Sequence, residues 1–372
     1  QSFNGTSQFG SEVQATINRT GDLIHYMYLV VNLPAIEAGP ADDNCCYKIV
    51  PYDSEAPVVN WVNEIGHALL RRVCYSIGGQ QVDAVYSQYM HAWEELAGKP
   101  GKRLREMIGK RDTRAELITD SSSERRLYIP FPFTFNQHSG NALPLVSLQF
   151  HSVCVHVQYE TLQNLIQVSA PDSVINKSTG NIMANTDLSA YLDTTYIYLD
   201  MEERERFSTN EFQQLIVQVQ SWGAVNQNDA FIRAQLNFNH PTLELIWCLQ
   251  SDEARERNEH FNYSGVHGED IITNARLTIN NLPRFHRESA YFRMVQPYQH
   301  PTNVPASKVY SYSFALEPES FQPSGSLNFS RIDNAELHLD LNPEAASKVN
   351  LSVFARSWNV LRFKKGLGGV LF

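Results

Sequence analysis

The segment Ser152-Val-Cys-Val-His-Val-Gln158 decides the fold class, because apolar and polar residues alternate along it without interruption. An extended chain turns successive side chains to opposite faces, so all three valines would lie on one face of a sheet. This period of two predicts a β-strand with one buried face. The segments Glu12–Asn18 and Leu127–Phe135 show the same alternation.

The composition agrees with a β-rich globular chain. Of the 372 residues, 42% are apolar and 19% are charged, which excludes a disordered chain or a coiled coil. Aromatic residues make up 11% and favour strands, while 19 glycines and 17 prolines supply the turns that many strands need. At roughly 150 residues per domain, the length predicts two domains.

The expected strands fall into two blocks. The first block runs from Ser11 to Tyr159 and includes a last strand at Tyr196–Leu199. The second block comprises Leu215–Gln220, Phe231–Phe238, Leu243–Gln250, Ala275–Ile279, Tyr310–Leu316, Ala335–Leu341, Val349–Phe354 and Val360–Phe363. We therefore predict an all-β fold of two tandem sandwiches, residues 1–206 and residues 207–372, with about eight strands in each.

One part of the first block has a different spacing. Apolar residues between Val82 and Leu96 recur every three or four positions, which predicts a helix. A second short helix is expected at Lys102–Ile108, with Pro100 near its start. We interpret residues 82–114 as a helical insertion that lies over an open end or edge of a sheet.

The charged segment Asp200–Phe207 marks the boundary between the two blocks. Glu202 and Arg206 are four residues apart, which is the spacing of an ion pair on one face of a helix. We therefore expect one or two solvated helical turns to connect the two sandwiches.

The net charge argues against a protein that packages nucleic acid. With 30 basic and 40 acidic residues the formal charge is −10 and the isoelectric point about 5.6, whereas a genome-coating protein should be basic. A local basic cluster lacks interleaved aromatic residues that could stack on bases: Lys99, Lys102, Arg103, Arg105, Lys110, Arg111 and Arg114. We interpret it as a solvated helix face or as a patch that meets an acidic surface on a neighbouring subunit.

The sequence carries few targeting or redox signals. No run approaches the ~18 consecutive apolar residues of a membrane helix, and no secretory segment is visible near Gln1. The five cysteines are Cys45, Cys46, Cys74, Cys154 and Cys248. Their spacing fits neither a disulfide framework nor a zinc site, so we expect reduced thiols in a cytosolic assembly compartment.

The sequence lacks the common catalytic motifs. There is no Gly-x-Ser-x-Gly, no phosphate-binding Gly-x-x-x-x-Gly-Lys-Ser/Thr loop and no His-Glu-x-x-His. A metal-binding sandwich needs a His-x-His pair, which is also missing, and the nearest candidate ligands share a polar loop: His260, His267, Glu269 and Asp270. We expect no enzymatic activity, no cofactor and no metal. The glycines of 366–369 are interpreted as a turn after the last strand.

Six Asn-x-Ser/Thr triplets are candidate glycosylation sites: Asn4, Asn18, Asn176, Asn262, Asn328 and Asn350. A chain rich in asparagine produces such triplets by chance, and glycans require exposure to a lumenal compartment. The triplets alone therefore do not establish modification.

Several motifs, in order along nearly the whole chain, resemble those of one family. In the first half they are Asn18-Arg-Thr-Gly-Asp-Leu23, Ile77-Gly-Gly-Gln80, Leu127-Tyr-Ile-Pro130 and Tyr196-Ile-Tyr-Leu-Asp200. In the second half they are Leu236-Asn-Phe-Asn-His-Pro241, Tyr291-Phe-Arg-Met-Val-Gln-Pro-Tyr298, Pro323-Ser-Gly-Ser-Leu-Asn-Phe-Ser-Arg-Ile-Asp-Asn-Ala335 and Trp358-Asn-Val-Leu361. Together they resemble the major capsid protein of nucleocytoplasmic large DNA viruses, of the iridovirus, phycodnavirus and marseillevirus kind.

The resemblance implies a structural protein of the virion capsid. Members of this family fold as two consecutive eight-stranded jelly rolls, and three copies form a pseudo-hexagonal capsomer of an icosahedral shell. The implied partners are further copies of the chain, together with minor capsid and penton proteins. Contact with nucleic acid is not expected, contact with the internal viral membrane is expected to be indirect only, and assembly is expected in the host cytoplasm. The resemblance also implies an N-terminal arm of a few dozen residues that family members carry before the position that corresponds to Gln1.

The resemblance also gives a structural signature in the second half. Its residues are Pro323, Ser324, Gly325, Ser330, Arg331, Ile332, Asp333, Asn334, Trp358 and Asn359. We expect the signature to fix the packing of the last hairpin, and we expect Trp358 to lie in the core. The alternative function is a jelly-roll carbohydrate-binding or lectin-like protein, which the 17 tyrosines and 5 tryptophans suggest.

Overall fold

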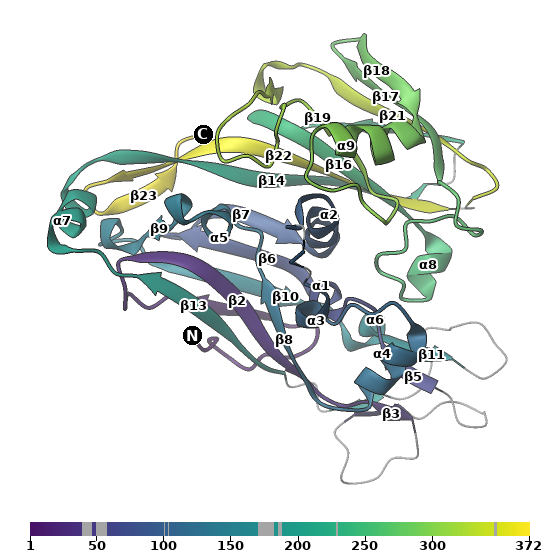
Figure 1. Ribbon diagram of the computed structural model, residues 1–372, viewed down its shortest axis with the longest axis horizontal. Coiled ribbons are helices and arrows are strands. Elements are labelled where there is room, and N and C mark those ends of the chain that lie inside the picture. The colour runs from purple at the N-terminus through teal and green to yellow at the C-terminus, as the bar shows by residue number, and fades with distance from the viewer. Residues whose placement is uncertain are drawn as a thin grey trace.

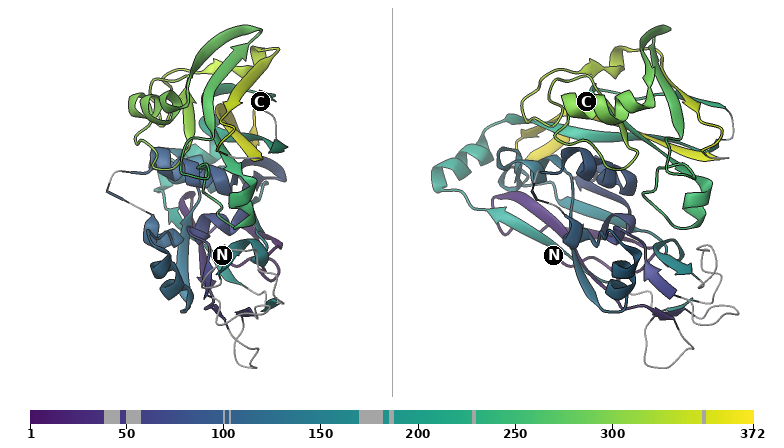
Figure 2. Two further views of the ribbon diagram at one scale, coloured as in Figure 1. Left: turned by 90° about the vertical axis from the view of Figure 1, so that its right-hand side faces the viewer. Right: turned by 45° about the vertical axis from the view of Figure 1, so that its right-hand side comes forward.

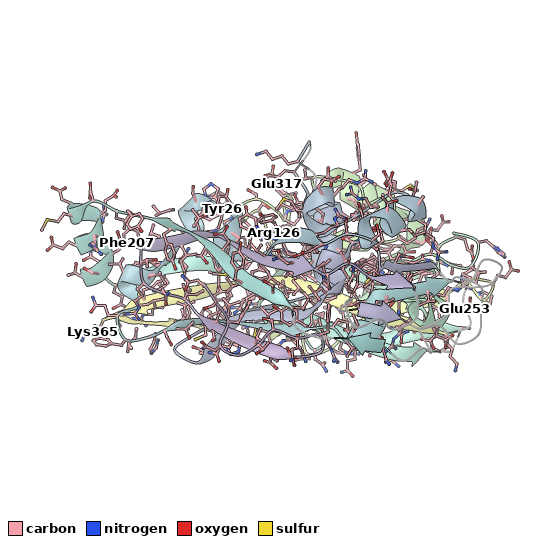
Figure 3. The ribbon with its side chains drawn as sticks, turned by 90° about the horizontal axis from the view of Figure 1, so that it is seen from below. Tyr26, Arg126, Phe207, Glu253, Glu317 and Lys365 are labelled. Carbon is pink, nitrogen blue, oxygen red and sulfur yellow. The ribbon has the colours of Figure 1, made fainter. Side chains whose placement is uncertain are left out.

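Two β-sandwiches lie one above the other, and Figures 1 and 2 show the same stacking from three sides. The computed structural model describes residues 1–38, 47–49, 58–99, 101–102, 104–169, 182–184, 188–227, 230–345 and 348–372. The chain passes from the first sandwich to the second through helix α7 (Met201–Thr209) at one end of the molecule. Figure 3 shows Phe207 of that helix at the end opposite Glu253.

Two sheets form the first sandwich. One sheet has the order β1 (Glu12–Thr16), β10 (Val153–Tyr159), β6 (Leu70–Ile77), β7 (Gln80–Tyr86). The other has the order β13 (Ser189–Ile197), β2 (Leu23–Leu33), β8 (Arg125–Pro130), and β9 (Leu143–Pro144) also pairs with β2. The three valines of β10 are at most 3% exposed, which confirms the strand that their alternation predicts.

Shorter elements surround these sheets. The short strands are β3 (Glu37–Ala38), β4 (Tyr47–Ile49), β5 (Val58–Trp61), β11 (Ile166–Ser169) and β12 (Ile182–Ala184). The helices are α1 (Ile65–Ala68), α2 (Ser87–Ala97), α3 (Arg105–Ile108), α4 (Arg114–Ser121), α5 (Thr134–Gln137) and α6 (Leu162–Leu165), with 3-10 turns at Ser139–Asn141 and Leu145–Ser147.

The second sandwich also has two sheets. One has the order β14 (Phe212–Gln227), β22 (Val349–Lys364), β16 (Pro241–Ser251), β19 (Tyr310–Ser313), with β20 (Leu327–Asn328) beside β16 and β23 (Leu367–Val370) beside β22. The other has the order β15 (Phe231–Gln235), β21 (Ala335–Leu341), β17 (Ile272–Ile279), β18 (Leu282–Glu288). Helix α8 (Asp252–Glu256), a π-helical turn η3 (Tyr291–Val295), α9 (Gln296–Gln299) and a 3-10 turn η4 (Phe329–Arg331) complete it.

Both sandwiches pair their strands in the same order. Taken along the chain, β1, β2, β6, β7, β8, β10 and β13 correspond to β15, β16, β17, β18, β19, β21 and β22. The second sandwich adds β14 beside β22, and the N-terminal residues take part of the equivalent place beside β13. There Gln1 N and O bond to Leu192 O and N at 2.7 and 2.8 Å, and Leu188 N donates to Ser7 O at 2.7 Å. Two sandwiches with this strand order are tandem jelly rolls, which confirms the predicted fold class.

The hydrophobic core of the first sandwich continues into the second. Strand β16 is buried on both faces: Leu245 and Trp247 point into the second sandwich, while Ile246 and Cys248 join the core of the first. Phe354 of β22 joins the first core too. The two sandwiches therefore fold against each other through a common apolar interior.

The helical insertion begins later than the sequence predicts. Residues 80–86 form strand β7, which pairs with β6 across the expected turn at Gly78 and Gly79, and helix α2 begins at Ser87. The expectation of a helix from Val82 is wrong because β7 is buried on both faces, so its apolar residues lose the period of two. Helix α3 covers only the end of the second expected helix, and α4 was not expected; its N-terminus is capped by Thr113.

Two further expectations about the second sandwich are wrong. The strands expected at Val349–Phe354 and Val360–Phe363 are one 16-residue strand, β22, whose central polar residues are buried against the first sandwich. The glycine-rich end, expected to be a turn, forms strand β23 beside β22. Strand β18 was missed because six of its seven residues are exposed, so no alternation marks it.

Helix α7 confirms the helical turn expected between the blocks. Asp200 caps it by accepting a hydrogen bond from Glu203 N at 2.9 Å, and Arg204 pairs with the buried Asp22 at 2.9 Å. The expected boundary between residues 206 and 207 falls inside this helix. No helix in the described ranges is long and apolar enough to cross a membrane.

Candidate assembly surfaces

Edge strand β7 of the first sandwich is bonded to edge strand β14 of the second. Asp83 Oδ1 accepts hydrogen bonds from Ala84 N and from Val219 N, both at 2.9 Å. Thr134 Oγ1 donates to Val217 O at 3.0 Å and accepts from Val217 N at 2.9 Å. Burial raises the pKa of the Asp83 carboxyl to about 7. The contact between the sandwiches is thus partly polar as well as apolar.

A buried ion pair lies in this contact, beneath helix α2. Arg356 of β22 and Glu244 of β16 are each 1% exposed, and the guanidinium of Arg356 donates to the Glu244 carboxylate. The guanidinium also lies 3.8 Å from the ring centroid of Trp93 on α2. Tyr89, one turn earlier on α2, packs against Phe354 with ring centroids 5.6 Å apart. Helix α2 therefore covers a charge that the second sandwich buries.

A second polar cluster joins α2 to a loop of the second sandwich. The buried Glu64 carboxylate lies 2.7 Å from His67 Nδ1, 2.9 Å from His91 Nδ1 and 3.1 Å from Lys110 Nζ. Although burial alone would raise it, the two histidines hold the pKa of Glu64 well below its ordinary value. His91 Nε2 lies 3.2 Å from Ser307 Oγ of the second sandwich.

Much of the predicted basic cluster is neutralised within the chain. Lys110 pairs with Glu64 and with Glu95, and Arg105 pairs with Asp112. Arg111 pairs with Glu106 and Asp120. Lys99 and Lys102 are exposed, and Arg103 lies outside the described residues.

The candidate metal ligands do not converge. His260 Nε2 lies 2.6 Å from Asn164 O, while Asp270 accepts from Tyr310 Oη at 3.1 Å and pairs with Arg293 and Lys308. Glu269 accepts from the backbone N of His267 at 2.9 Å. Within the described ranges, no three His, Cys, Asp or Glu side chains are grouped as a metal site would require. Cys74, Cys154 and Cys248 are free thiols, and Cys45 and Cys46 lie outside the described residues.

The signature segment connects β19 to β21 and is held by hydrogen bonds to Glu317, His240 and Asn280, which lie outside it. Ser324 Oγ accepts from Glu317 N at 2.9 Å and donates to Glu317 O at 3.0 Å. Ser330 Oγ accepts from His240 N at 2.8 Å, and Asn334 N donates to Asn280 Oδ1 at 3.1 Å.

Other signature residues differ in burial. Pro323, Gly325, Arg331 and Asp333 are exposed, and Ile332 is half-buried. Gly325 has a φ of +135°, a conformation that favours glycine.

The two signature residues on β22 also differ. Asn359 is buried and donates to Gln218 Oε1 at 2.8 Å and to Phe372 O at 3.0 Å. Trp358 is only half-buried, because it lies on the opposite face of the strand from Asn359. The expectation that Trp358 is a core residue is therefore wrong.

The candidate glycosylation sites differ in accessibility. Asn4, Asn18 and Asn262 are exposed, and Asn328 is half-buried with its Oδ1 accepting from Ser330 N at 3.0 Å. Asn350 is 8% exposed and donates to Asp252 Oδ1 at 2.6 Å, so a glycan there would displace an existing contact. Asn176 lies outside the described residues.

Three tyrosines are exposed on strands β2, β8 and β13, which form one sheet of the first sandwich. Tyr26 on β2 and Tyr128 on β8 are each 39% exposed, and Tyr191 on β13 is 38% exposed. We call them the tyrosine face. In β2, the exposed Tyr26 is followed by the buried Met27 and, two residues further on, by the buried Leu29. This alternation of tyrosine and aliphatic residues is visible in the sequence and could have identified this face.

A cleft of about 750 Å³ borders the tyrosine face. It is lined by Tyr26 of the first sandwich, Trp93 of α2 and Glu317 of the second sandwich. Figure 3 shows Tyr26, Arg126 and Glu317 on the same side of the molecule.

A second apolar surface lies on the second sandwich, on β18 and the turns that follow it. Leu282 is 72% exposed, Met294 44%, Val295 40% and Tyr298 82%. We call these four residues the β18–α9 face. The sequence reasoning missed it, because exposed apolar residues on an edge strand and a π-helical turn have no periodic pattern.

Comparisons with known proteins agree in both halves of the chain. A family model described as the N-terminus of the major capsid protein matches residues 1–200, and one described as the large eukaryotic DNA virus major capsid protein matches residues 203–369. The major capsid protein of Pyramimonas orientalis virus is 33% identical, over 100% of this chain and 89% of that protein. That of Paramecium bursaria Chlorella virus 1 is 31% identical, over 100% of this chain and 90% of that protein.

Solved structures show the same fold. A structure of the PBCV-1 virus capsid superimposes with a TM-score of 0.80 at 27% identity, covering 100% of this chain and 95% of that one. The Faustovirus major capsid protein superimposes with a TM-score of 0.74 at 13% identity, covering 97% and 89%. The chain therefore belongs to the family of major capsid proteins of large eukaryotic DNA viruses.

Proposed function

We propose that three copies of this chain form a ring of six jelly rolls, which is the pseudo-hexagonal capsomer of an icosahedral double-stranded DNA virus shell. The capsid role follows from the family, and the trimer is supported by the matching strand order of the two sandwiches. Two similar units per chain and three chains give six units around one axis, so a trimer can occupy a position with six neighbours.

The chain acts as a building block and not as an enzyme. The candidate ligands His260 and Asp270 are engaged with other protein groups, which supports a structural role for their loop. The relatives that match the whole chain are capsid proteins, which supports the same role. The rigid sandwiches hold the shape of the subunit, and the connecting loops supply the surfaces that neighbours contact.

Its partners are further copies of the chain, with minor capsid and penton proteins at the edges of the assembled surface. The net charge of −10 supports a shell that does not bind the genome and touches an internal membrane only through other proteins. The free thiols of Cys74 and Cys248 are buried, which supports assembly in the reducing cytoplasm of the host.

Sedimentation and electron microscopy of the purified protein test the trimer. We expect a species three times the mass of the 42.3 kDa chain at micromolar concentration, with a hexagonal outline in projection. A stable monomer under the same conditions would contradict the trimer. A monomer that binds a glycan array would instead favour the carbohydrate-binding alternative.

The signature segment is proposed to hold the connection between β19 and β21 in one conformation. The boundary between the two sandwich units is proposed to lie in α7. Replacing Ser324 by alanine removes two hydrogen bonds to Glu317, so we expect the free energy of unfolding to fall by about 1–2 kcal/mol. Chemical denaturation measures this free energy of unfolding. Ser326→Ala is the matched control, since Ser326 is exposed in the same segment, and equal stability of the two variants would count against this role.

A further inference from the structure

Helix α2, which Figure 1 shows between the two sandwiches, is hydrogen-bonded to the loop of the second sandwich that joins α9 to β19. At the C-terminal end of the helix, Asn303 N donates to Leu96 O at 2.9 Å. One oxygen of the Glu95 carboxylate accepts from Ala306 N at 2.7 Å and from Ser307 N at 3.4 Å. The loop is therefore attached to the first sandwich through its backbone amides.

Two buried carboxylates support this attachment. Lys110 Nζ bridges them, at 2.8 Å from Glu95 Oε1 and 3.1 Å from Glu64 Oε2. Glu64 also contacts His91, whose other ring nitrogen lies 3.2 Å from Ser307 Oγ. Charge-assisted contacts thus connect the first sandwich to the loop. We call the residues of this connection the α2 clasp: Glu64, His67, His91, Glu95, Lys110, Asn303, Ala306 and Ser307.

Two other titratable groups face the clasp, Glu94 on α2 and Tyr263 of the second sandwich. Burial raises the pKa of Tyr263 well above its ordinary value, so its hydroxyl stays neutral. Burial also raises the pKa of Glu94, so its carboxyl loses its charge before those of the clasp do. Although burial opposes the effect, Glu64 and Glu95 raise the pKa of Lys110, so the ammonium group stays charged. In acid, the clasp groups that can gain protons are therefore the two carboxylates and the two imidazoles.

Protonation of the imidazoles leaves the clasp connected. Nδ1 of His67 and Nδ1 of His91 both face the Glu64 carboxylate, so in each neutral ring this nitrogen carries the proton. A second proton adds positive charge beside an anion. Ser307 Oγ can then accept from His91 Nε2 instead of donating to it.

Protonation of the carboxylates breaks the clasp. Although burial alone would raise it, Lys110 holds the pKa of Glu95 below its ordinary value of 4.5, and the histidines hold the pKa of Glu64 well below that value. Such carboxyls stabilise the fold above pH 4.5 and lose this contribution as the pH falls through their folded pKa values. Lys110 is then left half-buried without an anion, and the amides of Ala306 and Ser307 lose a charged acceptor.

The apolar interior beside the clasp does not depend on these charges. Val309, directly after the loop, is 0% exposed and belongs to the core of the first sandwich, as do Ile246 and Phe354. Opening a loop exposes much less apolar surface than separating the two sandwiches, so it costs less free energy. The loop can therefore leave α2 while the two sandwiches remain joined.

We propose that the α2 clasp is an acid-operated latch, which holds the loop between α9 and β19 against helix α2 at neutral pH and releases it when Glu64 and Glu95 are protonated. The latch belongs to the single chain and does not require the proposed trimer. Acid thereby changes the conformation of one loop of the capsid subunit without separating its two halves.

Hydrogen exchange of the purified full chain, followed by mass spectrometry from pH 7 to pH 3.5, measures the release. After correction for intrinsic rates, the amides of Asn303, Ala306 and Ser307 are expected to lose about tenfold in protection below pH 4.5. Between pH 7 and pH 5.5 their protection should stay constant. Amides of β16 report the joint between the sandwiches and are expected to stay protected throughout.

Glu95→Gln imitates the protonated carboxyl at every pH, so we expect low protection of the loop amides already at pH 7 and little change in acid. Glu116→Gln on α4 is the matched control, since Glu116 is exposed, and it should behave as the wild type does. If Glu95→Gln does not fold, Asn303→Ala replaces it. This variant removes the side-chain bond to Gly98 O and leaves every charge in place, so it should lower protection at all pH values and keep the acid step.

Constant protection of the loop amides from pH 7 to pH 3.5 would overturn the latch. A loss centred between pH 7 and pH 5.5 would overturn it too, because it would assign the switch to the histidines. Simultaneous loss of protection in the loop and in β16 would show unfolding of the whole junction instead of a latch. An unchanged acid step in Glu95→Gln would remove the carboxylate from the mechanism.

Discussion

Replacing Arg356 by alanine is expected to lower the free energy of unfolding by about 3–5 kcal/mol, because it leaves the Glu244 carboxylate buried without its cation. Both side chains are 1% exposed, so water cannot take the place of the guanidinium. The substitution also removes the group that lies 3.8 Å from the Trp93 ring, and with it a contact between the sandwiches. Urea denaturation followed by tryptophan fluorescence measures the loss.

A double variant separates the cost of an unpaired charge from the cost of lost packing. Arg356→Met combined with Glu244→Met replaces the ion pair with apolar side chains of similar length, which is often neutral for stability. We expect it to recover most of the stability that Arg356→Ala loses. If the single variant unfolds at the wild-type urea concentration, the ion pair does not stabilise the junction as argued.

Replacing Asp83 by asparagine is expected to make the protein more stable than the wild type at pH 8 but not at pH 5. The pKa of this carboxyl is about 7 in the folded chain and 3.8 ordinarily, so the folded state holds the proton more tightly than the unfolded chain does. Its contribution to stability is present below pH 3.8 and is lost as the pH rises through 7. Between pH 5 and pH 8 the wild type should lose about 2–3 kcal/mol through this group.

The asparagine oxygen can still accept the two backbone hydrogen bonds from Ala84 and Val219, so the variant keeps the junction without the buried charge. Thermal unfolding of both proteins at pH 5 and pH 8 gives the comparison. Asp333→Asn changes an exposed carboxyl and should leave the pH dependence of the wild type unchanged. Parallel pH profiles for wild type and Asp83→Asn would show that burial does not perturb this group.

Sequence reasoning succeeded where a strand has one buried face. The valines of β10 alternate with polar residues, and the structure buries all three. The apolar run Leu245–Leu249 of β16 predicts a strand but does not reveal which surfaces bury it. Here both faces are covered, because Trp247 packs inside the second sandwich and Ile246 against the first.

The same reasoning failed where one sandwich covers the other. Strand β7 has apolar residues on both faces, so its pattern resembles that of a helix. Polar residues in the middle of β22, such as Arg356 and Ser357, suggested a break between two strands, although both are buried in the junction. The cluster around Glu64 joins residues as distant as Lys110, and through His91 it reaches Ser307 of the second sandwich, so no local pattern marks it. Such features depend on contacts between distant segments.

The continuous interior across the two sandwiches has a consequence for how a curved container can be built. Since Phe354 and Ile246 belong to the same packed interior as the valines of β10, the two halves cannot pivot without opening it. Each molecule is then a rigid subunit whose shape is fixed when it folds. A shell made from such subunits must take up its curvature at the contacts between separate molecules, where no interior has to be broken.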